Sequence, residues 1–458
     1  MDIQNTLQDK KKLPLIIVGI VIILVILLAL FLLLFSKKKN TVPTQESGTT
    51  GTKVSGEIVY WGLWESPQVM ESLITEFESK NPGVKIKYSQ QTFSGYENRL
   101  YTRLQQTATT SEPAPDVFRI HNTWLPKYTS LLDPMPTSVM TRDEYSQKFY
   151  PTALADFTSK DGVSIYAIPL EIDGLMVFYN KQILAEQNVK EPPRDWDAFI
   201  SLARKLTKKD SSRRITQSGL ALGTSRNIQH SSEILLFLLL QEGVDLMDSS
   251  RTKISLNNSK TIGIFQTYID FATGSNAVWS PSLSNDLNMF YSGKLAMMIA
   301  PSWRAFDIIK SSSAIEFGTA PLPQLEANKN EVYYSTYWGE AVNKKSTNKE
   351  LAWKFVKFLA EKEQQLKMYS NSSTIGERAF GEPYSLVELN SEMKGKAYVD
   401  AIATMAPYMK SWQLGDENFV RSAIEEAVTQ IAENGKDVTT ILRETENTIN
   451  TRLAQTNK

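Results

Sequence analysis

The sequence predicts an α/β protein that is preceded by a single transmembrane helix. Three observations support this prediction: a long uncharged run near the N-terminus, alternating strand and helix patterns after it, and capped amphipathic helices further along the chain. Strands that alternate with helices form parallel sheets, because each helix returns the chain to the edge where the next strand begins.

Composition excludes several kinds of site. The chain has 458 residues, with 50 Lys plus Arg, 50 Asp plus Glu, 2 His and no Cys. A balanced charge argues against a nucleic-acid partner. Without cysteine there are no disulfides, thiolate nucleophiles or Cys-ligated metals, and His121 and His230 show no metal-binding spacing. We therefore expect no cofactor and no metal site. Nothing in the sequence places a matched acid and base, so no catalytic residues are predicted.

The first element is the uncharged run at residues 13–35, which is bounded by three lysines on each side. As a helix of 1.5 Å per residue it would span about 35 Å, more than the roughly 30 Å hydrocarbon core. A cleavable signal peptide is the alternative, but its apolar region is shorter and a small-residue cleavage site follows it. We interpret residues 1–12 as a short cytoplasmic tail and residues 13–35 as an uncleaved anchor.

Residues 36–55 are polar and rich in Thr, Ser and Gly, which is typical of a flexible tether with a reach of roughly 20 to 25 Å. The body that follows starts with a strand at "GEIVYW", and Ser66 with Pro67 is the cap and first residue of a helix that "NPG" ends. "VKIKY", a helix with Tyr96, Leu100 and Leu104, and the strand "DVFRI" complete a parallel layer.

Aromatic and polar residues follow two of these strands. Trp61 and Trp64 lie at the end of the first strand, and His121, Asn122 and Trp124 follow the third. Ligands of parallel α/β sheets bind at the carboxyl ends of strands, so we expect these residues to share one edge.

Further along, Asp195 caps a helix that runs to residue 206, and residues 233–243 read as a buried core helix. Gly293 marks a turn into a strand that ends at Trp303. Residues 347–366 are predicted to form one amphipathic helix.

Seven segments in order resemble the extracellular solute-binding proteins of ABC importers, in the carbohydrate-binding branch typified by maltose-binding protein. They are "GEIVYWGLWES…MESLITEFESKNPGVKIKY", "APDVFRIHNTW", "YAIPLEIDGLMVFYNKQIL", "PRDWDAFISLARKL", "FYSGKLAMMIAPSW", "FGTAPLPQ" and "GEAVNKKSTNKELAWKFVKFLAEKEQQ". The resemblance covers roughly residues 56–375.

The resemblance implies a periplasmic-binding-protein-like fold with two lobes, a hinge and a ligand cleft between the lobes. On family precedent the N-lobe is residues 56–170 plus 338–374, and the C-lobe is residues 171–337 plus 375–458. The family's lipidated cysteine is absent here, and the anchor is the expected replacement. The family's glycine-proline-arginine pattern is also absent, and only Arg378 of "STIGERAF" is carried over.

Sugar rings have apolar faces and polar edges, so a site for them needs aromatic platforms together with carboxylates, amides or arginine. We predict that Trp64, Trp124, Trp303 and Trp338 are ligand-binding aromatic residues, and Trp303 matches the tryptophan that the family places against a sugar. Packing in the core is the alternative role for each tryptophan.

The predicted polar ligand-binding residues are Asn122, Glu171, Asp173 and Arg378. Asn122 follows a strand, while Glu171 and Asp173 lie in "PLEIDG", where family members use a carboxylate to accept hydroxyl hydrogen bonds. Alternatively, the two carboxylates brace the hinge and Asn122 forms a turn.

The predicted function is a membrane-anchored, monomeric binding subunit of an ABC importer for a carbohydrate, most simply an oligosaccharide. The partners are then permease subunits and a separate ATPase, since the chain has no phosphate-binding loop. The protein is placed at the cell membrane as a single-pass protein, with its large domain extracellular or periplasmic.

Other functions stay open: a peptide, polyol phosphate or ferric ion as ligand, a ligand sensor, and an extracellular glycoside-processing enzyme. Tyr333, Tyr334 and Tyr337 are the candidate iron ligands, and 50 acidic residues supply candidate catalytic pairs.

Overall fold

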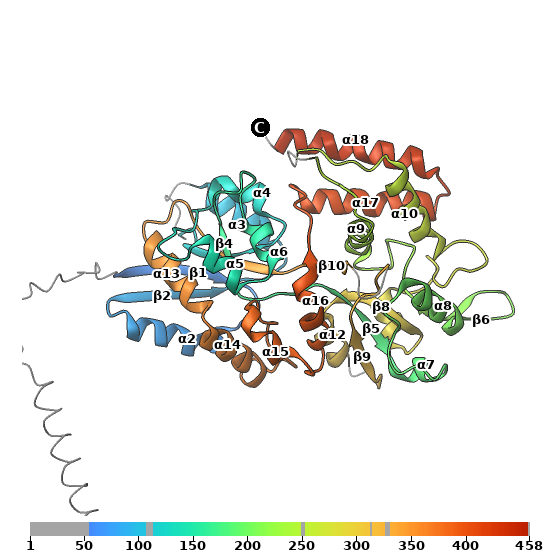
Figure 1. Cartoon of the computed structure of the whole chain (residues 1–458), viewed down its shortest axis with the longest axis horizontal. Coiled ribbons are helices and arrows are strands. Elements are labelled where there is room, and N and C mark those ends of the chain that lie inside the picture. Colours follow the sequence, from blue (N-terminus) through green and yellow to red (C-terminus); the bar gives the residue numbers. More distant parts are fainter. Residues whose placement is uncertain (1–54, 107–112, 249–251, 312–313, 326–329, 457–458) are drawn as a thin grey trace, which may run out of the picture. The chain divides into compact units, whose positions relative to one another are not determined.

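The computed structural model describes residues 55–106, 113–248, 252–311, 314–325 and 330–456 (Figure 1). The predicted tail, anchor and almost all of the tether lie outside these residues. Within the part of the chain that the structure describes, no helix is both long and apolar enough to cross a membrane.

The first sheet has the strand order β2-β1-β3-β11-β4. Strand β1 runs parallel to β2 and β3, as predicted, whereas β11 runs antiparallel to both β3 and β4. The strands are β1 (Gly56–Gly62), β2 (Val84–Gln90), β3 (Val117–His121), β4 (Ala167–Pro169) and β11 (Trp338–Val342).

Helices cover this sheet for the reasons that the sequence indicates. In α2 (Pro67–Lys80), the Ser66 hydroxyl accepts a hydrogen bond from the Val69 amide, and Leu73 and Phe77 are buried. The other helices of this part are α3 (Tyr96–Gln105), α4 (Leu125–Tyr128), η2 (Thr129–Leu131), α5 (Arg142–Lys148), α6 (Pro151–Phe157), α13 (Lys349–Leu359) and α14 (Lys362–Thr374).

The prediction of one helix over residues 347–366 was wrong, because two helices, α13 and α14, share this region. The backbone of Glu361 is extended, with φ −70° and ψ 149°, and breaks the helix after Ala360. The break allows α14 to turn onto α2, where Gln364 and Lys367 both donate hydrogen bonds to Glu76.

The second sheet has the strand order β6-β7-β8-β5-β9, and the fully buried strand β8 lies between β7 and β5. Its strands are β5 (Leu175–Asn180), β6 (Lys208–Lys209), β7 (Ile215–Leu220), β8 (Leu295–Pro301) and β9 (Phe317–Ala320). Helices α7, α8 and α11 pack against it, and α17 and α18 lie side by side next to α10 (Figure 1).

The helices in and around the second sheet include the predicted buried helix, which is α9. They are α7 (Lys181–Ala185), α8 (Trp196–Leu206), α9 (Ser231–Gln241), α10 (Ser259–Asp270), α11 (Asp286–Tyr291), α12 (Arg304–Lys310), η3 (Val387–Leu389), α15 (Asn390–Met393), α16 (Asp400–Met405), η4 (Ala406–Tyr408), α17 (Glu417–Ala432) and α18 (Val438–Thr456).

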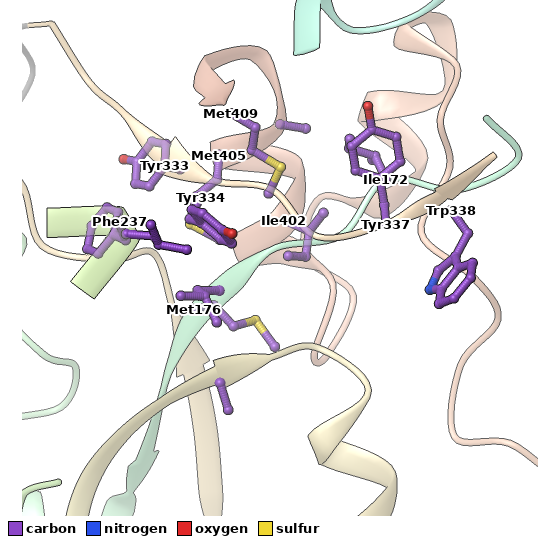
Figure 2. Close-up of a cluster of buried hydrophobic side chains, with 14 of the residues drawn as sticks. Ile172, Met176, Phe237, Tyr333, Tyr334, Tyr337, Trp338, Ile402, Met405 and Met409 are labelled. Carbon is purple, nitrogen blue, oxygen red and sulfur yellow. The ribbon is translucent and has the colours of Figure 1, made fainter. Parts of the chain in front are cut away.

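Three connecting segments, residues 171–174, 335–338 and 382–385, lie side by side where the chain passes between the two sheets. Strand β10 (Tyr333–Tyr334) precedes the second of them and pairs with β12 (Met409–Lys410). Figure 2 shows Ile172, Tyr334 and Ile402 from this region among other buried side chains. The connecting segments therefore belong to the hydrophobic core that the two sheets share.

Replacing Gly174 with alanine is expected to lower the free energy of unfolding by about 1–3 kcal/mol, because an added Cβ would lie 2.2 Å from the Tyr334 carbonyl oxygen. The matched control is Gly263→Ala in α10, where nothing lies within 4 Å and helix propensity favours alanine by about 1 kcal/mol. Urea denaturation measures both variants. Equal stabilities would contradict the close packing of the connecting segments.

Candidate functional site

Four aromatic residues gather at one end of the first sheet, and we name Trp64, Phe93, Trp124 and Trp338 the aromatic cluster. The Trp338 ring lies at the centre, with its centroid 5.0 Å from that of Trp124, 6.0 Å from that of Trp64 and 6.2 Å from that of Phe93. Strand pairing explains the arrangement, because Trp338 is the register partner of His121 at the end of β3.

Exposure divides the aromatic cluster into two layers. Trp124 and Trp338 are buried, whereas Trp64 is 36% exposed and Phe93 is 60% exposed. Edge-to-face contacts of Trp338 support the exposed pair, and Trp124 packs against Trp338 from the buried side. The outer rings therefore present an aromatic surface on a rigid base.

Trp303 lies at the other end of the candidate site, directly before α12, and is 41% exposed. The Arg304 guanidinium lies over its ring at 4.1 Å from the centroid, and the His230 ring centroid is 5.9 Å away. This cation–π contact covers part of the indole and leaves the rest accessible.

A series of charged and polar side chains, which we name the polar chain, links the two aromatic ends. Beside the aromatic cluster, His121 Nδ1 lies 3.4 Å from Glu417 Oε2, and the Thr123 hydroxyl donates to the same oxygen. Arg421 then contacts Glu417 at 3.9 Å and Glu233 at 3.0 Å. Both acids are buried, so each arginine contact replaces lost hydration.

The polar chain continues from Glu233 to Trp303. His230 Nδ1 lies 2.8 Å from Glu233 Oε2, and Arg304 Nε donates to His230 Nε2 at 3.1 Å. Because Nε2 accepts from arginine, the ring proton is assigned to Nδ1, which donates to Glu233. Both histidines of the sequence thus take part in one network.

Electrostatics favour the ionised form of the two acids in the polar chain. Burial raises the pKa of Glu417, but His121, Arg421 and Thr123 outweigh it and lower the pKa to about 2. Burial also raises the pKa of Glu233, but Arg421 and His230 outweigh it, so this pKa is lowered as well. The polar chain therefore carries its carboxylates as anions at neutral pH.

Glu417→Gln is expected to reduce the loss of stability in acid. A carboxyl with a depressed pKa stabilises the fold above its unfolded value of about 4.3, and this contribution is lost as pH falls toward about 2. The melting temperature measured from pH 6 to pH 3 should fall less steeply in the variant. Glu71→Gln, on the exposed face of α2, serves as the control. Parallel curves for all three proteins would contradict this role of Glu417.

Glu171 lies in the first connecting segment and is buried. Its Oε1 accepts a hydrogen bond from the Trp338 amide at 3.1 Å. Burial, together with the neighbouring Glu382, raises the pKa of Glu171 well above its usual value, while Arg378 and a hydrogen bond with Glu171 help to hold the pKa of Glu382 at about 2 despite burial. Of the two carboxyls, Glu171 is therefore the one whose neutral form is favoured.

Asp173 is buried in the same segment and also contacts protein groups. It accepts hydrogen bonds from the Gly174 amide at 2.7 Å and from the Ser302 hydroxyl at 2.8 Å. Burial raises its pKa to about 7.

Asn122 is fully buried after β3 and is bonded to three neighbours. Its amide group donates to Asp156 at 3.0 Å and accepts from the Tyr337 amide at 3.2 Å. Its backbone carbonyl oxygen accepts a hydrogen bond from the Gln413 side-chain amide at 2.7 Å. Asn122 thus joins the first sheet to the segment that follows β12.

Arg378 has its charge balanced inside the protein. It contacts Glu65 at 3.1 Å and Glu382 at 2.8 Å, and its guanidinium lies over the Phe306 ring at 4.6 Å. A paired arginine of this kind is a poor receptor for an anionic ligand, because binding would have to displace its own acids.

Of the predicted site residues, Trp64 and Trp303 are exposed, while Asn122, Trp124, Glu171, Asp173 and Trp338 are buried. Sequence reasoning missed Phe93 and the polar chain. Phe93 has only one sequence signal, its place between a strand and a helix on the same edge as Trp64. The polar chain joins residues from four distant stretches, so no local pattern indicates it.

Iron coordination by tyrosines receives no support from the geometry. Tyr333, Tyr334 and Tyr337 are all buried, and burial raises their pKa values, which opposes the tyrosinate form. The Tyr337 hydroxyl donates to Asp156 at 2.8 Å. In the described ranges, no group of three or more His, Asp or Glu side chains is placed to hold a metal ion.

Two known proteins are similar in sequence to much of this chain. The diacetylchitobiose-binding protein DasA of Streptomyces coelicolor is 26% identical over 401 residues, covering 84% of this chain and 86% of the relative. The maltotriose-binding protein of Pyrococcus abyssi is 24% identical over 325 residues, covering 68% and 64%.

Solved structures support a two-lobed α/β fold of the periplasmic-binding-protein type. An ABC substrate-binding protein of Listeria monocytogenes in complex with cycloalternan superposes with a TM-score of 0.67 at 20% identity, covering 87% of this chain and 99% of that protein. The cyclic alpha-maltosyl-1,6-maltose binding protein of Arthrobacter globiformis gives 0.69 at 17% identity, covering 88% and 100%.

The family described as bacterial extracellular solute-binding protein matches residues 62–366, which is more than half of the 458-residue chain. This match confirms the resemblance that the seven sequence segments indicate. The chain is therefore a member of the bacterial extracellular solute-binding protein family.

Proposed function

We propose that this protein captures a carbohydrate, most simply an oligosaccharide, and delivers it to the permease of an ABC importer. One observation carries the proposal: exposed aromatic rings lie at both ends of a polar chain, with Trp64 and Phe93 at one end and Trp303 at the other. Flat rings suit the apolar faces of sugars, and the partly exposed His121 and Arg421 between them suit the hydroxyls. The names of the relatives, which bind diacetylchitobiose and maltotriose, agree with this chemistry.

In this proposal the predicted site residues have two roles. Trp64 and Trp303 contact the ligand, together with Phe93. The other predicted residues act through their neighbours: Trp338 supports the exposed rings and is backed by Trp124, while Asn122, Glu171, Asp173 and Arg378 hold the connecting segments. Because Arg378 is already paired, the ligand is expected to be uncharged, which disfavours a polyol phosphate.

The proposed lobes are residues 56–170 plus 338–374 and residues 171–337 plus 375–458. Ligand contacts from both lobes would stabilise a closed form by the difference in affinity between the open and closed states. Residues 13–35 are proposed as the membrane anchor and residues 36–55 as the tether, which would keep the binding domain near the permease and raise its local concentration. The permease and ATPase are separate chains in this scheme, and the binding protein is a monomer.

The test is a thermal-shift screen of the full-length protein in detergent against oligosaccharides, monosaccharides, polyol phosphates, short peptides and ferric citrate. A ligand at 100 times its Kd adds about 2.7 kcal/mol of apparent stability. Stabilisation by a neutral oligosaccharide is the expected result, and incubation with that sugar should leave it chemically unchanged. A shift with peptides or ferric citrate alone would overturn the carbohydrate proposal, and cleavage of the sugar would indicate an enzyme.

Import and sensing use the same binding step and are separated by a transport assay. Cells that lack this protein should lose uptake of the radiolabelled sugar if it serves an importer. Unchanged uptake with a lost transcriptional response would favour a sensor instead.

A further inference from the structure

Two carboxyls on one connecting segment each contact the backbone beside a different tryptophan. Glu171 accepts from the Trp338 amide, at the aromatic cluster. Asp173 accepts from Ser302, the residue immediately before Trp303. One short segment thus contacts the backbone at Trp338 and at Ser302, near the two aromatic ends of the proposed site.

We propose that Asp173 is a positioning residue that sets the orientation of Trp303, and that proton binding to Asp173 makes ligand affinity depend on pH. The inference rests on the proposed function, because it assigns Trp303 as a ligand contact.

The hydrogen bonds of Asp173 support the positioning role. Its Oδ2 accepts from the Ser302 hydroxyl at 2.8 Å, and its Oδ1 accepts from the Gly174 amide at 2.7 Å and from the Ser302 amide at 3.4 Å. Ser302 in turn begins the turn that leads into α12, since its carbonyl accepts from the Ala305 amide at 3.0 Å. The carboxylate therefore fixes the turn that carries Trp303.

The ionised carboxylate accepts from all three donors, whereas in the protonated carboxyl one oxygen carries a hydrogen and accepts more weakly. Hydrogen bonds to an ionised group are also stronger than those to a neutral one. Loss of the charge is thus expected to loosen the Ser302 turn and to let the Trp303 ring reorient.

The surroundings of Asp173 place this change near neutral pH. Burial is the main cause that raises the pKa of Asp173 to about 7, and the negative charge of Glu382 adds to it, while the Gly174 and Ser302 donors oppose it. Glu171, two residues away, is the other acid that interacts with it. Because the pKa is raised, the anion is present above about pH 7 and is lost below it. Affinity should accordingly rise with pH.

The first arm of the test needs no ligand. The tryptophan fluorescence of the full-length protein is titrated from pH 5.5 to 8.5, and the curve of Trp303→Phe is subtracted to isolate Trp303 from the other tryptophans. We expect a titration with a midpoint near pH 7 in the wild type and a flat curve in Asp173→Asn, which mimics the protonated form. A flat wild-type difference curve, or an unchanged midpoint in Asp173→Asn, would overturn the inference.

The second arm measures the Kd for maltotriose or diacetylchitobiose, whichever stabilises the protein, over the same pH range. We expect affinity to increase about fivefold from pH 6 to pH 8 in the wild type and to stay at the low-pH value in Asp173→Asn. Binding that is equally tight at both pH values would overturn the inference while leaving the proposed function intact. If no carbohydrate binds, the proposed function fails, and the first arm still decides whether Asp173 controls Trp303.

A second variant guards against misfolding of Asp173→Asn. Ser302→Ala removes the hydroxyl donor and leaves the carboxyl in place. With one donor lost, the anion is less favoured, so the fluorescence midpoint should move to higher pH. A midpoint identical to that of the wild type would show that the Ser302 contact does not control the titration.

Discussion

Trp303→Ala is expected to weaken carbohydrate binding about 30-fold, which corresponds to about 2 kcal/mol, and to change the melting temperature of the free protein little. The indole is 41% exposed, so its removal leaves no large cavity in the core. Its loss would remove a flat apolar surface against which the Arg304 guanidinium packs, 4.1 Å from the ring centroid. Isothermal titration calorimetry with the oligosaccharide from the screen measures the change in Kd.

Trp303→Phe is the matched control, since a phenyl ring keeps part of the stacking surface. We expect it to lose less than tenfold in affinity. If Trp303→Ala binds as tightly as the wild type, the residue does not contact the ligand, and Trp64 with Phe93 would be the remaining exposed rings of the proposed site.

Replacing Arg119 with methionine is expected to lower the free energy of unfolding by about 3–5 kcal/mol. Arg119 is 1% exposed, and its Nε lies 2.8 Å from Glu340 Oε1 while Nη1 lies 3.6 Å from Glu65 Oε2. Both acids are buried, and burial raises the pKa of each. Without the arginine charge, two buried carboxyls would lose their main counter-ion inside the first sheet.

Urea denaturation measures this effect against two comparisons. Lys85→Ala removes a 2.7 Å ion pair with Glu78 from the surface and should cost no more than about 1 kcal/mol, because Lys85 is 71% exposed. The double variant Arg119→Met with Glu340→Met should recover part of the loss, since Glu65 keeps Arg378 as a partner. A single variant as stable as Lys85→Ala would contradict the importance of the buried pair.

Local elements could be predicted from the sequence because their causes lie close together in the chain. The cap at Ser66, the buried stripe of α2 and the parallel pairing of β1 with β2 and β3 all depend on residues within a few turns or one connection of each other. The break between α13 and α14 could not be predicted, because Glu361 suits a helix and only the docking of α14 on α2 favours the extended backbone.

The candidate site, too, could be predicted only where its features depend on residues close together in the chain. The sequence indicates that Trp64 and Trp303 follow strands, but the same pattern holds for Trp124, which the structure buries. Which ring stays exposed depends on β11, since Trp338 fills the space beside Trp124 from more than 200 residues away. The polar chain could not be predicted for a similar reason. Glu233 and Glu417 both contact Arg421 only once α9 and α17 pack together.

The place of β11 in the first sheet also determines when that sheet can form. This strand lies between β3 and β4, yet residues 338–342 are synthesised long after the strands on either side. Until the ribosome has released residue 342, the inner edge of β3 has no neighbour, and the buried Arg119 lacks Glu340. Such long-range pairing slows folding and leaves an open strand edge on the growing chain. The nascent protein therefore stays incompletely folded, and in need of protection from aggregation, until most of it has been made.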